Sequence, residues 1–214
     1  MPTLSALARA RRIKLILFDV DGVLTDGKIW IFPAPGGTVA TPQPSILEKT
    51  AAGASRPEEP GGSGFHSPTL IEAKGFHAHD GTAIMLARMA GIKTGVITKR
   101  VSETVALRTR DLKMEHVYQG IQDKGAAFRQ ILEKDGITAA EAAFVGDDVI
   151  DLPAMRACGL AIAVQNARPE VKAAAHWTTP HAGGDGAARD AIEFILKAQK
   201  KWTKTVEAYI SEKD

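Results

Sequence analysis

Short apolar runs alternate with segments of helical pattern along most of this chain, and this alternation constrains its fold more than any other feature. The runs Ile13–Phe18, Lys93–Thr98 and Ala142–Val145 have the character of buried strands, and each is followed by polar residues and a helical segment. Strands that alternate with helices form a parallel sheet covered on both faces. We therefore predict an α/β fold. The other predicted strands of the sheet are His116–Tyr118, Leu160–Val164 and His176–Thr178, and the predicted helices are Asp80–Ala90, Ser102–Leu112, Lys124–Lys134, Val149–Ala157, Pro169–Ala174 and Gly186–Gln199.

Length and charge favour a single globular domain over residues 1–214. The chain has 214 residues, of which 44% are hydrophobic and 24% charged, and its net charge is only +2. Such a balance gives no reason to expect a nucleic-acid or membrane partner. Cys158 is the only cysteine, which excludes an intramolecular disulfide framework and favours a reducing, cytoplasmic environment. No apolar run approaches the ~20 residues of a membrane helix, and we identify no targeting segment.

One stretch, residues 33–68, differs from the rest in composition. It holds seven of the 11 prolines and six of the 20 glycines, and it lacks apolar periodicity. Such a segment buries too little surface to offset the entropy lost on ordering. We interpret it as a flexible insertion between two short strands, Ile29–Phe32 and Leu70–Phe76.

The polar residues that follow the strands point to a common site. Asp19 and Asp21 follow the first strand, Thr98 a later one and Asp147 another, and Lys124 begins a helix. Ligands of open parallel sheets bind at the carboxyl ends of the strands, so these side chains should converge at one edge. Clustered carboxylates repel one another unless a cation lies among them, and Mg²⁺ prefers such oxygen ligands.

This set of side chains suits phosphoryl transfer. Asp19 would attack phosphorus and form an aspartyl-phosphate. Asp21 would protonate the leaving alkoxide and then deprotonate the water that hydrolyses the intermediate. Thr98 and Lys124 would hold the phosphoryl oxygens while charge redistributes.

Each of these residues has an ordinary structural interpretation as well. Aspartates after strands often cap helices or form turns, Thr98 could be a plain strand end, and Lys124 could be solvated. Two other functions are compatible with parts of the pattern. A phospho-acceptor signalling domain uses similar groups, although its acidic pair and phosphorylated aspartate lie on different strands. A catalytically weak scaffold could use the insertion to bind a partner.

The motifs resemble those of the haloacid dehalogenase superfamily of aspartate-nucleophile phosphatases. The closer resemblance is to the 3-deoxy-D-manno-octulosonate 8-phosphate phosphatase family, in the segments DVDGVLTDG, VITKRVSETVALRTRDL, HVYQGIQDK, GDDVIDLPAM and GGDGAARDAIEFILKAQ. It covers the chain from about Lys14 to Gln199 apart from the insertion. It implies a Rossmann-like domain without a cap, and a β-hairpin that covers the site of a neighbouring subunit in a homotetramer.

The resemblance also implies a substrate and a set of contacts. The enzyme would release phosphate from 3-deoxy-D-manno-octulosonate 8-phosphate, a step in lipopolysaccharide precursor synthesis. Asp19, Asp147 and the backbone carbonyl of Asp21 would bind Mg²⁺. The residues expected to contact the substrate are Asp21, His77, His79, Asp80, Gly81, Arg100, Arg108 and Lys124.

Some positions depart from the family pattern near the substrate. Lys99 and Ala83 stand where the family has glycine, and His79 and Met85 replace basic residues. These changes bear on the particular sugar more than on the reaction. The alternative substrate is a nine-carbon nonulosonate 9-phosphate or another sugar phosphate.

The tail from Lys197 to Asp214 carries five lysines among apolar residues, which fits an amphipathic extension, a subunit-contact arm or a membrane-surface helix.

Overall fold

The main element of the structure, a computed structural model, is a six-stranded sheet in which all strands are parallel. The structure describes residues 4–34 and 70–211. In spatial order the strands are β5 (His116–Tyr118), β4 (Lys93–Ile97), β1 (Leu15–Phe18), β6 (Ala142–Gly146), β7 (Leu160–Ala163) and β8 (Trp177–Thr178). The predicted parallel α/β fold is confirmed.

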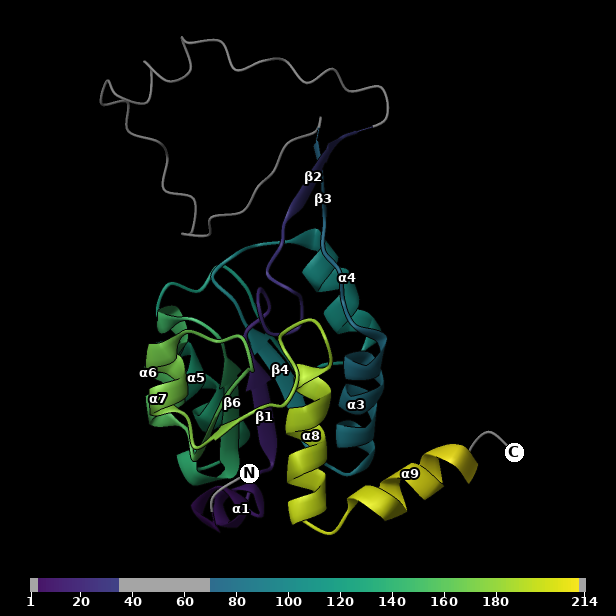
Figure 1. Ribbon diagram of the computed structural model, residues 1–214, viewed down its shortest axis with the longest axis vertical. Helices are drawn as coiled ribbons and strands as arrows, with labels where there is room; N and C mark the ends of the chain where they lie inside the picture. Colours follow the sequence, from purple (N-terminus) through teal and green to yellow (C-terminus); the bar gives the residue numbers. More distant parts are fainter. Residues whose placement is uncertain (1–3, 35–69, 212–214) are drawn as a thin grey trace.

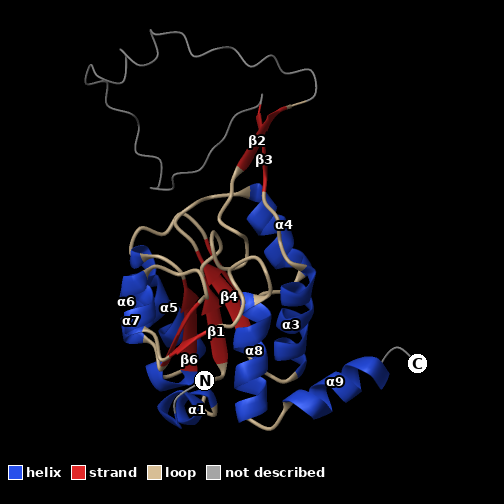
Figure 2. Ribbon diagram, viewed as in Figure 1, coloured by secondary structure: helices blue, strands red, loops and turns tan. Residues whose placement is uncertain are grey.

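Helices cover both faces of this sheet. Figures 1 and 2 show α5, α6 and α7 on one side and α3, α4 and α8 on the other. Within the described residues, the α-helices are α1 (Leu4–Ala10), α3 (Ala78–Met89), α4 (Glu103–Asp111), α5 (Lys124–Asp135), α6 (Leu152–Ala157), α7 (Pro169–Ala174), α8 (Ala187–Ala198) and α9 (Trp202–Ser211).

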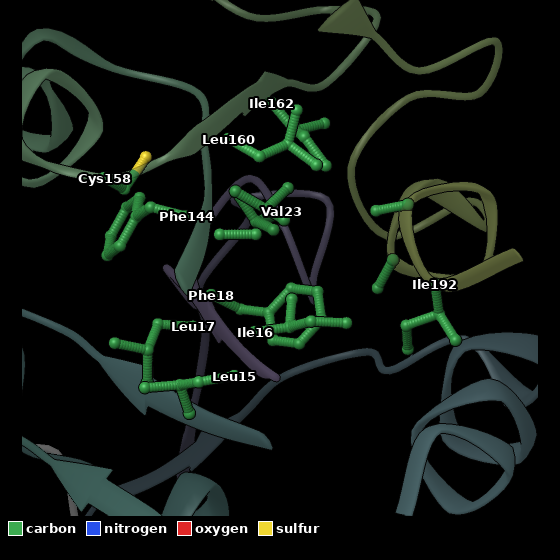
Figure 3. Packing of buried hydrophobic residues seen from close by; sticks show 14 of the residues in the cluster. Leu15, Ile16, Leu17, Phe18, Val23, Phe144, Cys158, Leu160, Ile162 and Ile192 are labelled. Atoms are coloured by element: carbon green, nitrogen blue, oxygen red, sulfur yellow. The ribbon is translucent and has the colours of Figure 1, made fainter. Parts of the chain in front are cut away.

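The core lies between these layers and explains why the first strand is apolar throughout. Leu15 and Leu17 point to one face of the sheet, whereas Ile16 and Phe18 point to the other, toward Ile192 of α8 (Figure 3). All four β1 side chains are fully buried. Successive side chains of a strand alternate between faces, so a strand covered on both sides must be apolar at every position.

A separate antiparallel hairpin extends from the end of the body at which the strands of the sheet finish (Figure 1). It pairs β2 (Trp30–Pro33) with β3 (Leu70–Ala73). Both strands agree with the prediction, although β3 is shorter than the predicted Leu70–Phe76. The predicted flexible insertion, apart from its first two residues, lies outside the described residues.

Three local features differ from the sequence-based prediction. The predicted helix Val149–Ala157 consists of a 3₁₀ turn, Val149–Asp151, followed by α6. The side chain of Asp151 accepts hydrogen bonds from backbone amides of the preceding turn, and Pro153 then occupies the first turn of α6, where no amide hydrogen is needed. Helix α1 was not predicted, and the tail forms α9, which packs on α3 and α8. None of the described helices has the length and apolar character needed to cross a membrane.

Candidate active site

The carboxyl ends of three adjacent strands carry the central polar residues. Strand β1 lies between β4 and β6, and Asp19, Thr98 and Asp147 directly follow β1, β4 and β6, respectively. Asp19 and Thr98 are buried, and Asp147 is half-buried. The structure therefore brings these three predicted site residues to the same edge of the sheet.

Lys124 enters this edge from the first residue of α5. Its Nζ lies 2.8 Å from Asp19 Oδ1 and 2.6 Å from Asp151 Oδ1, and its side chain is almost completely buried. Asp123 caps the helix by accepting a hydrogen bond from the amide of Ala126, which sets where α5 begins. An ammonium group buried to this degree is stable only with opposite charges around it, so Lys124 and the two aspartates form one unit.

Asp151 uses both of its oxygens within the protein. Oδ1 accepts from Lys124, and Oδ2 accepts from the backbone amides of Asp147 at 3.0 Å and Asp148 at 3.3 Å. The side chain is fully buried. Asp151 therefore holds both the lysine and the loop that carries Asp147.

Burial and mutual repulsion change the protonation of the cluster. Burial and the nearby charge of Asp151 raise the pKa of Asp19 to about 7, although Lys124 opposes the shift. Burial and the charges of Asp19, Asp151 and Asp148 raise the pKa of Asp147 to about 8. Burial lowers the pKa of Lys124, but Asp19 and Asp151 outweigh it, so the net shift is upward. Without a cation, the site holds more negative charge than it can stabilise.

The cluster fits a hard divalent cation. Asp19, Asp147 and Asp151 each offer an oxygen, and these oxygens lie within 4.8 Å of one another. Asp147 Oδ1 is buried and has no hydrogen-bond partner among the described residues. Oxygen-rich acidic sites of this kind match the preferences of Mg²⁺. Because both oxygens of Asp151 are already engaged, Asp19 and Asp147 are the carboxylates best placed to be direct ligands.

Asp21 lies in a second charged network, which involves the root of the hairpin. Its Oδ1 forms an ion pair with Lys74, and its Oδ2 lies 3.7 Å from Arg100 Nε. Glu72 Oε2 accepts from Arg100 Nη2 at 3.0 Å, and Glu72 Oε1 accepts from Ser102 Oγ at 2.7 Å. Burial raises the pKa of Glu72, but the hydrogen bonds from Ser102 and Arg100, with the charge of Lys74, lower it overall.

The remaining predicted substrate residues gather around the start of α3. Arg108 packs against Gly81, where a Cβ would overlap its guanidinium group, and lies 5.8 Å from the ring centroid of Phe76. The rings of His77 and His79 meet edge to face at 4.8 Å, and His77 Nε2 lies 4.0 Å from a carboxylate oxygen of Asp185. These contacts form a group distinct from the acidic cluster.

Asp80 belongs to this group but makes its contact with another helix. Its Oδ1 accepts a hydrogen bond from the backbone amide of Arg189, in the first turn of α8, at 2.8 Å. The side chain is buried, which raises its pKa despite the hydrogen bonds from Arg189 and Gly186. Asp80 thus caps α8 from outside, a structural contact that the sequence does not reveal.

Lys74, Glu72 and Asp151 were not predicted as site residues. Asp151 had a usable signal, because it belongs to the GDDVID segment that follows a strand. Lys74 and Glu72 had none, because charged residues in a short strand beside an insertion normally face solvent.

Comparisons with known proteins agree with this geometry. The family model for haloacid dehalogenase-like hydrolases matches residues 95–190. The 3-deoxy-D-manno-octulosonate 8-phosphate phosphatase KdsC of Escherichia coli K12 is 34% identical over 195 residues, which cover 91% of this chain and 85% of the relative.

Solved structures extend the comparison to bound ligands. The phosphatase of the same name from Moraxella catarrhalis, in complex with magnesium, phosphate and KDO, has a TM-score of 0.76 and 30% identity, covering 95% of this chain and 97% of that one. A cobalt-bound enzyme from Haemophilus influenzae has a TM-score of 0.70 and 30% identity, covering 90% and 92%. With its parallel sheet, its acidic cluster and these relatives, the chain belongs to the haloacid dehalogenase-like hydrolases and, within them, to the 3-deoxy-D-manno-octulosonate 8-phosphate phosphatase (KdsC) family.

Proposed function

We propose that this protein is a Mg²⁺-dependent phosphatase that converts 3-deoxy-D-manno-octulosonate 8-phosphate to the free sugar acid and phosphate, a step in lipopolysaccharide precursor synthesis. The observation that carries the proposal is the pairing of Lys124 with Asp19 and Asp151 at the strand edge beside Asp147. The names of the relatives at 30–34% identity supply the substrate.

The metal site in this proposal consists of Asp19 and Asp147, with the backbone carbonyl of Asp21 as a further ligand. Asp151 supports the site by holding Lys124 and the loop of Asp147. When bound, Mg²⁺ neutralises the carboxylates and the phosphate and polarises the phosphoryl group.

The chemistry is carried by two aspartates. Asp19 attacks phosphorus, the ester bond to the sugar oxygen breaks, and an aspartyl-phosphate forms. Asp21 gives its proton to the departing alkoxide and then takes one from the water that hydrolyses the intermediate. Lys124 and the Thr98 hydroxyl hold the phosphoryl oxygens as charge builds up on them.

The remaining substrate contacts come from the two groups beside this cluster. Arg100 and Arg108 provide guanidinium groups suited to the substrate carboxylate. Because Arg100 Nη2 already donates to Glu72, Arg100 would use its remaining N–H donors. Arg108 Nε is buried without a hydrogen-bond partner in the described part of the chain, which leaves a donor for a ligand. In this proposal His77, His79, Asp80 and Gly81 shape the wall around Arg108.

We also propose that four subunits assemble and that the hairpin of each covers a neighbour's site. Four large apolar side chains of the hairpin are between 47% and 54% exposed: Trp30, Ile31, Phe32 and Ile71. Phe32 and Ile71 are partners across the two strands, and exposed apolar side chains gathered on one short element are typical of protein–protein contacts. Sedimentation equilibrium of wild type and of a Trp30→Ser/Phe32→Ser variant tests the assembly, with loss of the larger species expected only in the variant.

A phosphate-release assay tests the reaction and the substrate together. The panel comprises the eight-carbon sugar acid 8-phosphate, a nine-carbon 9-phosphate and simple hexose phosphates, each with Mg²⁺ and with EDTA. We expect the highest kcat/KM for the eight-carbon substrate and no turnover in EDTA. A higher kcat/KM for the nine-carbon substrate would replace the proposed sugar, and turnover in EDTA would overturn the metal requirement.

A further inference from the structure

Lys74, at the root of the hairpin, is a fully buried lysine that the mechanism above does not use. Its side chain has no solvent exposure, and Nζ pairs with Asp21 and lies 3.8 Å from Glu72 Oε1. Burying an ammonium group costs several kcal/mol unless opposite charges compensate for it. Its closest partner is the carboxylate that we propose to move protons in the reaction.

The backbone fixes Lys74 on both sides against the loop that carries Asp21. Before Lys74, Ala73 pairs with Trp30 in the hairpin ladder, and after it Phe76 forms an antiparallel bridge with Thr25. The loop is closed by its own hydrogen bonds, since the amide and hydroxyl of Thr25 both donate to the carbonyl of Val20. Strand pairing on one side and the Thr25–Phe76 bridge on the other therefore fix the backbone of Lys74 next to the loop that carries Asp21.

Glu72 completes the surroundings of Asp21. It accepts hydrogen bonds from Arg100 and Ser102 and lies beside Lys74. Glu72 therefore contacts both Lys74 and Arg100, the two cationic side chains that face Asp21. Its side chain is only 11% exposed. Oδ1 of Asp21 is thus paired with Lys74, which restrains rotation about Cβ–Cγ, whereas Oδ2 lies 3.7 Å from Arg100 Nε, beyond hydrogen-bond distance, and is the oxygen that carries the transferred proton.

We propose that Lys74 is a positioning residue that holds the Asp21 carboxylate in the orientation needed for proton transfer to the leaving group. The inference rests on the proposed function, in which the O–H bond of Asp21 breaks as the new O–H bond of the sugar alcohol forms. Acid–base groups of this kind contribute about 10²–10⁴-fold to rate. If the Asp21 carboxylate is misplaced, the reaction loses much of this rate enhancement, but only for substrates whose leaving group must be protonated.

Leaving-group dependence tests this role. The kcat/KM values of wild type, Lys74→Met and Lys74→Gln are measured for an alkyl phosphate and for p-nitrophenyl phosphate, whose phenolate departs without a proton. Because kcat/KM reports the steps up to departure, we expect a loss of at least about 30-fold for the alkyl phosphate and less than about threefold for the aryl ester. Lys28→Met is the matched control, since Lys28 is exposed and pairs with Asp26.

A double-mutant cycle with Asp21→Asn gives a second, independent readout. If Lys74 acts through Asp21, adding Lys74→Met to Asp21→Asn changes kcat/KM less than about threefold. Equal losses for both esters, or additive losses in the cycle, would overturn the positioning role. If Lys74→Met alone does not fold but the double variant with Asp21→Asn does, the result supports the pairing of Lys74 with Asp21. If neither variant folds, the proposal is overturned. Absence of wild-type turnover on any phosphomonoester would instead refute the proposed function.

Discussion

Asp147 packs its carboxylate against the bare Cα of Gly22, so no side chain at position 22 is compatible with the acidic cluster. A Cβ on residue 22 would lie 2.6 Å from Asp147 Cγ, well inside van der Waals contact. Gly22 also has φ +95°, a conformation that residues with side chains rarely adopt. The glycine that follows Asp21 is therefore part of the site rather than a simple turn former.

Gly22→Ala should weaken Mg²⁺ binding and turnover together. We expect a loss of at least about tenfold in Mg²⁺ affinity, because Asp147 must move, and backbone strain of about 1–3 kcal/mol. Titration calorimetry and thermal melts measure the two effects. Gly136→Ala is the control, since Gly136 has φ +63° and no neighbouring atom within 4 Å of the place that a Cβ would occupy. Equal metal affinity in Gly22→Ala and wild type would contradict the steric argument.

Asp19→Asn should remove phosphatase activity while the fold remains. The carboxylate is the proposed nucleophile, and groups that act as a unit with their neighbours cause severe losses when removed. We expect kcat below about 1% of wild type, with a native circular dichroism spectrum. Turnover above that level in a preparation free of wild-type enzyme would refute the nucleophile assignment.

The arrangement of the sheet and the meeting of its strand-end residues are predictable from sequence, for a physical reason. Apolar runs that alternate with helices permit few topologies, and a parallel sheet brings the residues after its strands to one edge. That is why Asp19, Thr98 and Asp147 can be assigned to one place from sequence alone, and why Lys124 joins them.

Contacts across long sequence separations are not predictable in this way. The pairing of Lys74 with Asp21 depends on the bridge between Thr25 and Phe76, which spans the insertion. Similarly, nothing in the sequence around Asp80 indicates that it hydrogen-bonds to the start of α8, 109 positions later. Local patterns predict which residues follow a strand, but they do not predict which distant backbone group a side chain will meet.

Asp147→Asn and Asp151→Asn should differ in their effect on the metal. Asp147 has a buried oxygen without a hydrogen-bond partner in the described residues, whereas both oxygens of Asp151 are engaged. A supporting residue typically changes metal affinity by about 10–100-fold, so Asp151→Asn should stay in that range. Asp147→Asn should lose more, because a ligand is removed. Mg²⁺ titration of both variants decides the order, and a greater loss in Asp151→Asn would make Asp151 the ligand.

Asp80→Asn separates a structural role from substrate contact. Asn keeps an acceptor for the Arg189 amide, whereas Asp80→Ala removes it and should cost about 0.5–2 kcal/mol as a lost helix cap. Because Asp80 contacts α8, we expect the alanine variant to lower Tm and the asparagine variant to leave KM within about twofold of wild type. A KM increase in Asp80→Asn without a change in Tm would instead show direct contact with the substrate.

The stability of the metal-free protein should fall as pH rises through neutrality, and Mg²⁺ should reverse this. In the folded protein the pKa values of Asp19 and Asp147 are about 7 and about 8, against an ordinary value of 3.8. Between pH 3.8 and about 8 the folded state holds protons that the unfolded chain has released, so the free energy of unfolding decreases with rising pH. Bound Mg²⁺ replaces those protons and stabilises the ionised carboxylates.

Thermal melts in EDTA should therefore show Tm falling from pH 6 to pH 8, and the increase in Tm on adding Mg²⁺ should be larger at pH 8. Asp147→Asn should flatten the EDTA profile, and a wild-type profile already flat in EDTA would mean that the cluster carries no excess protons.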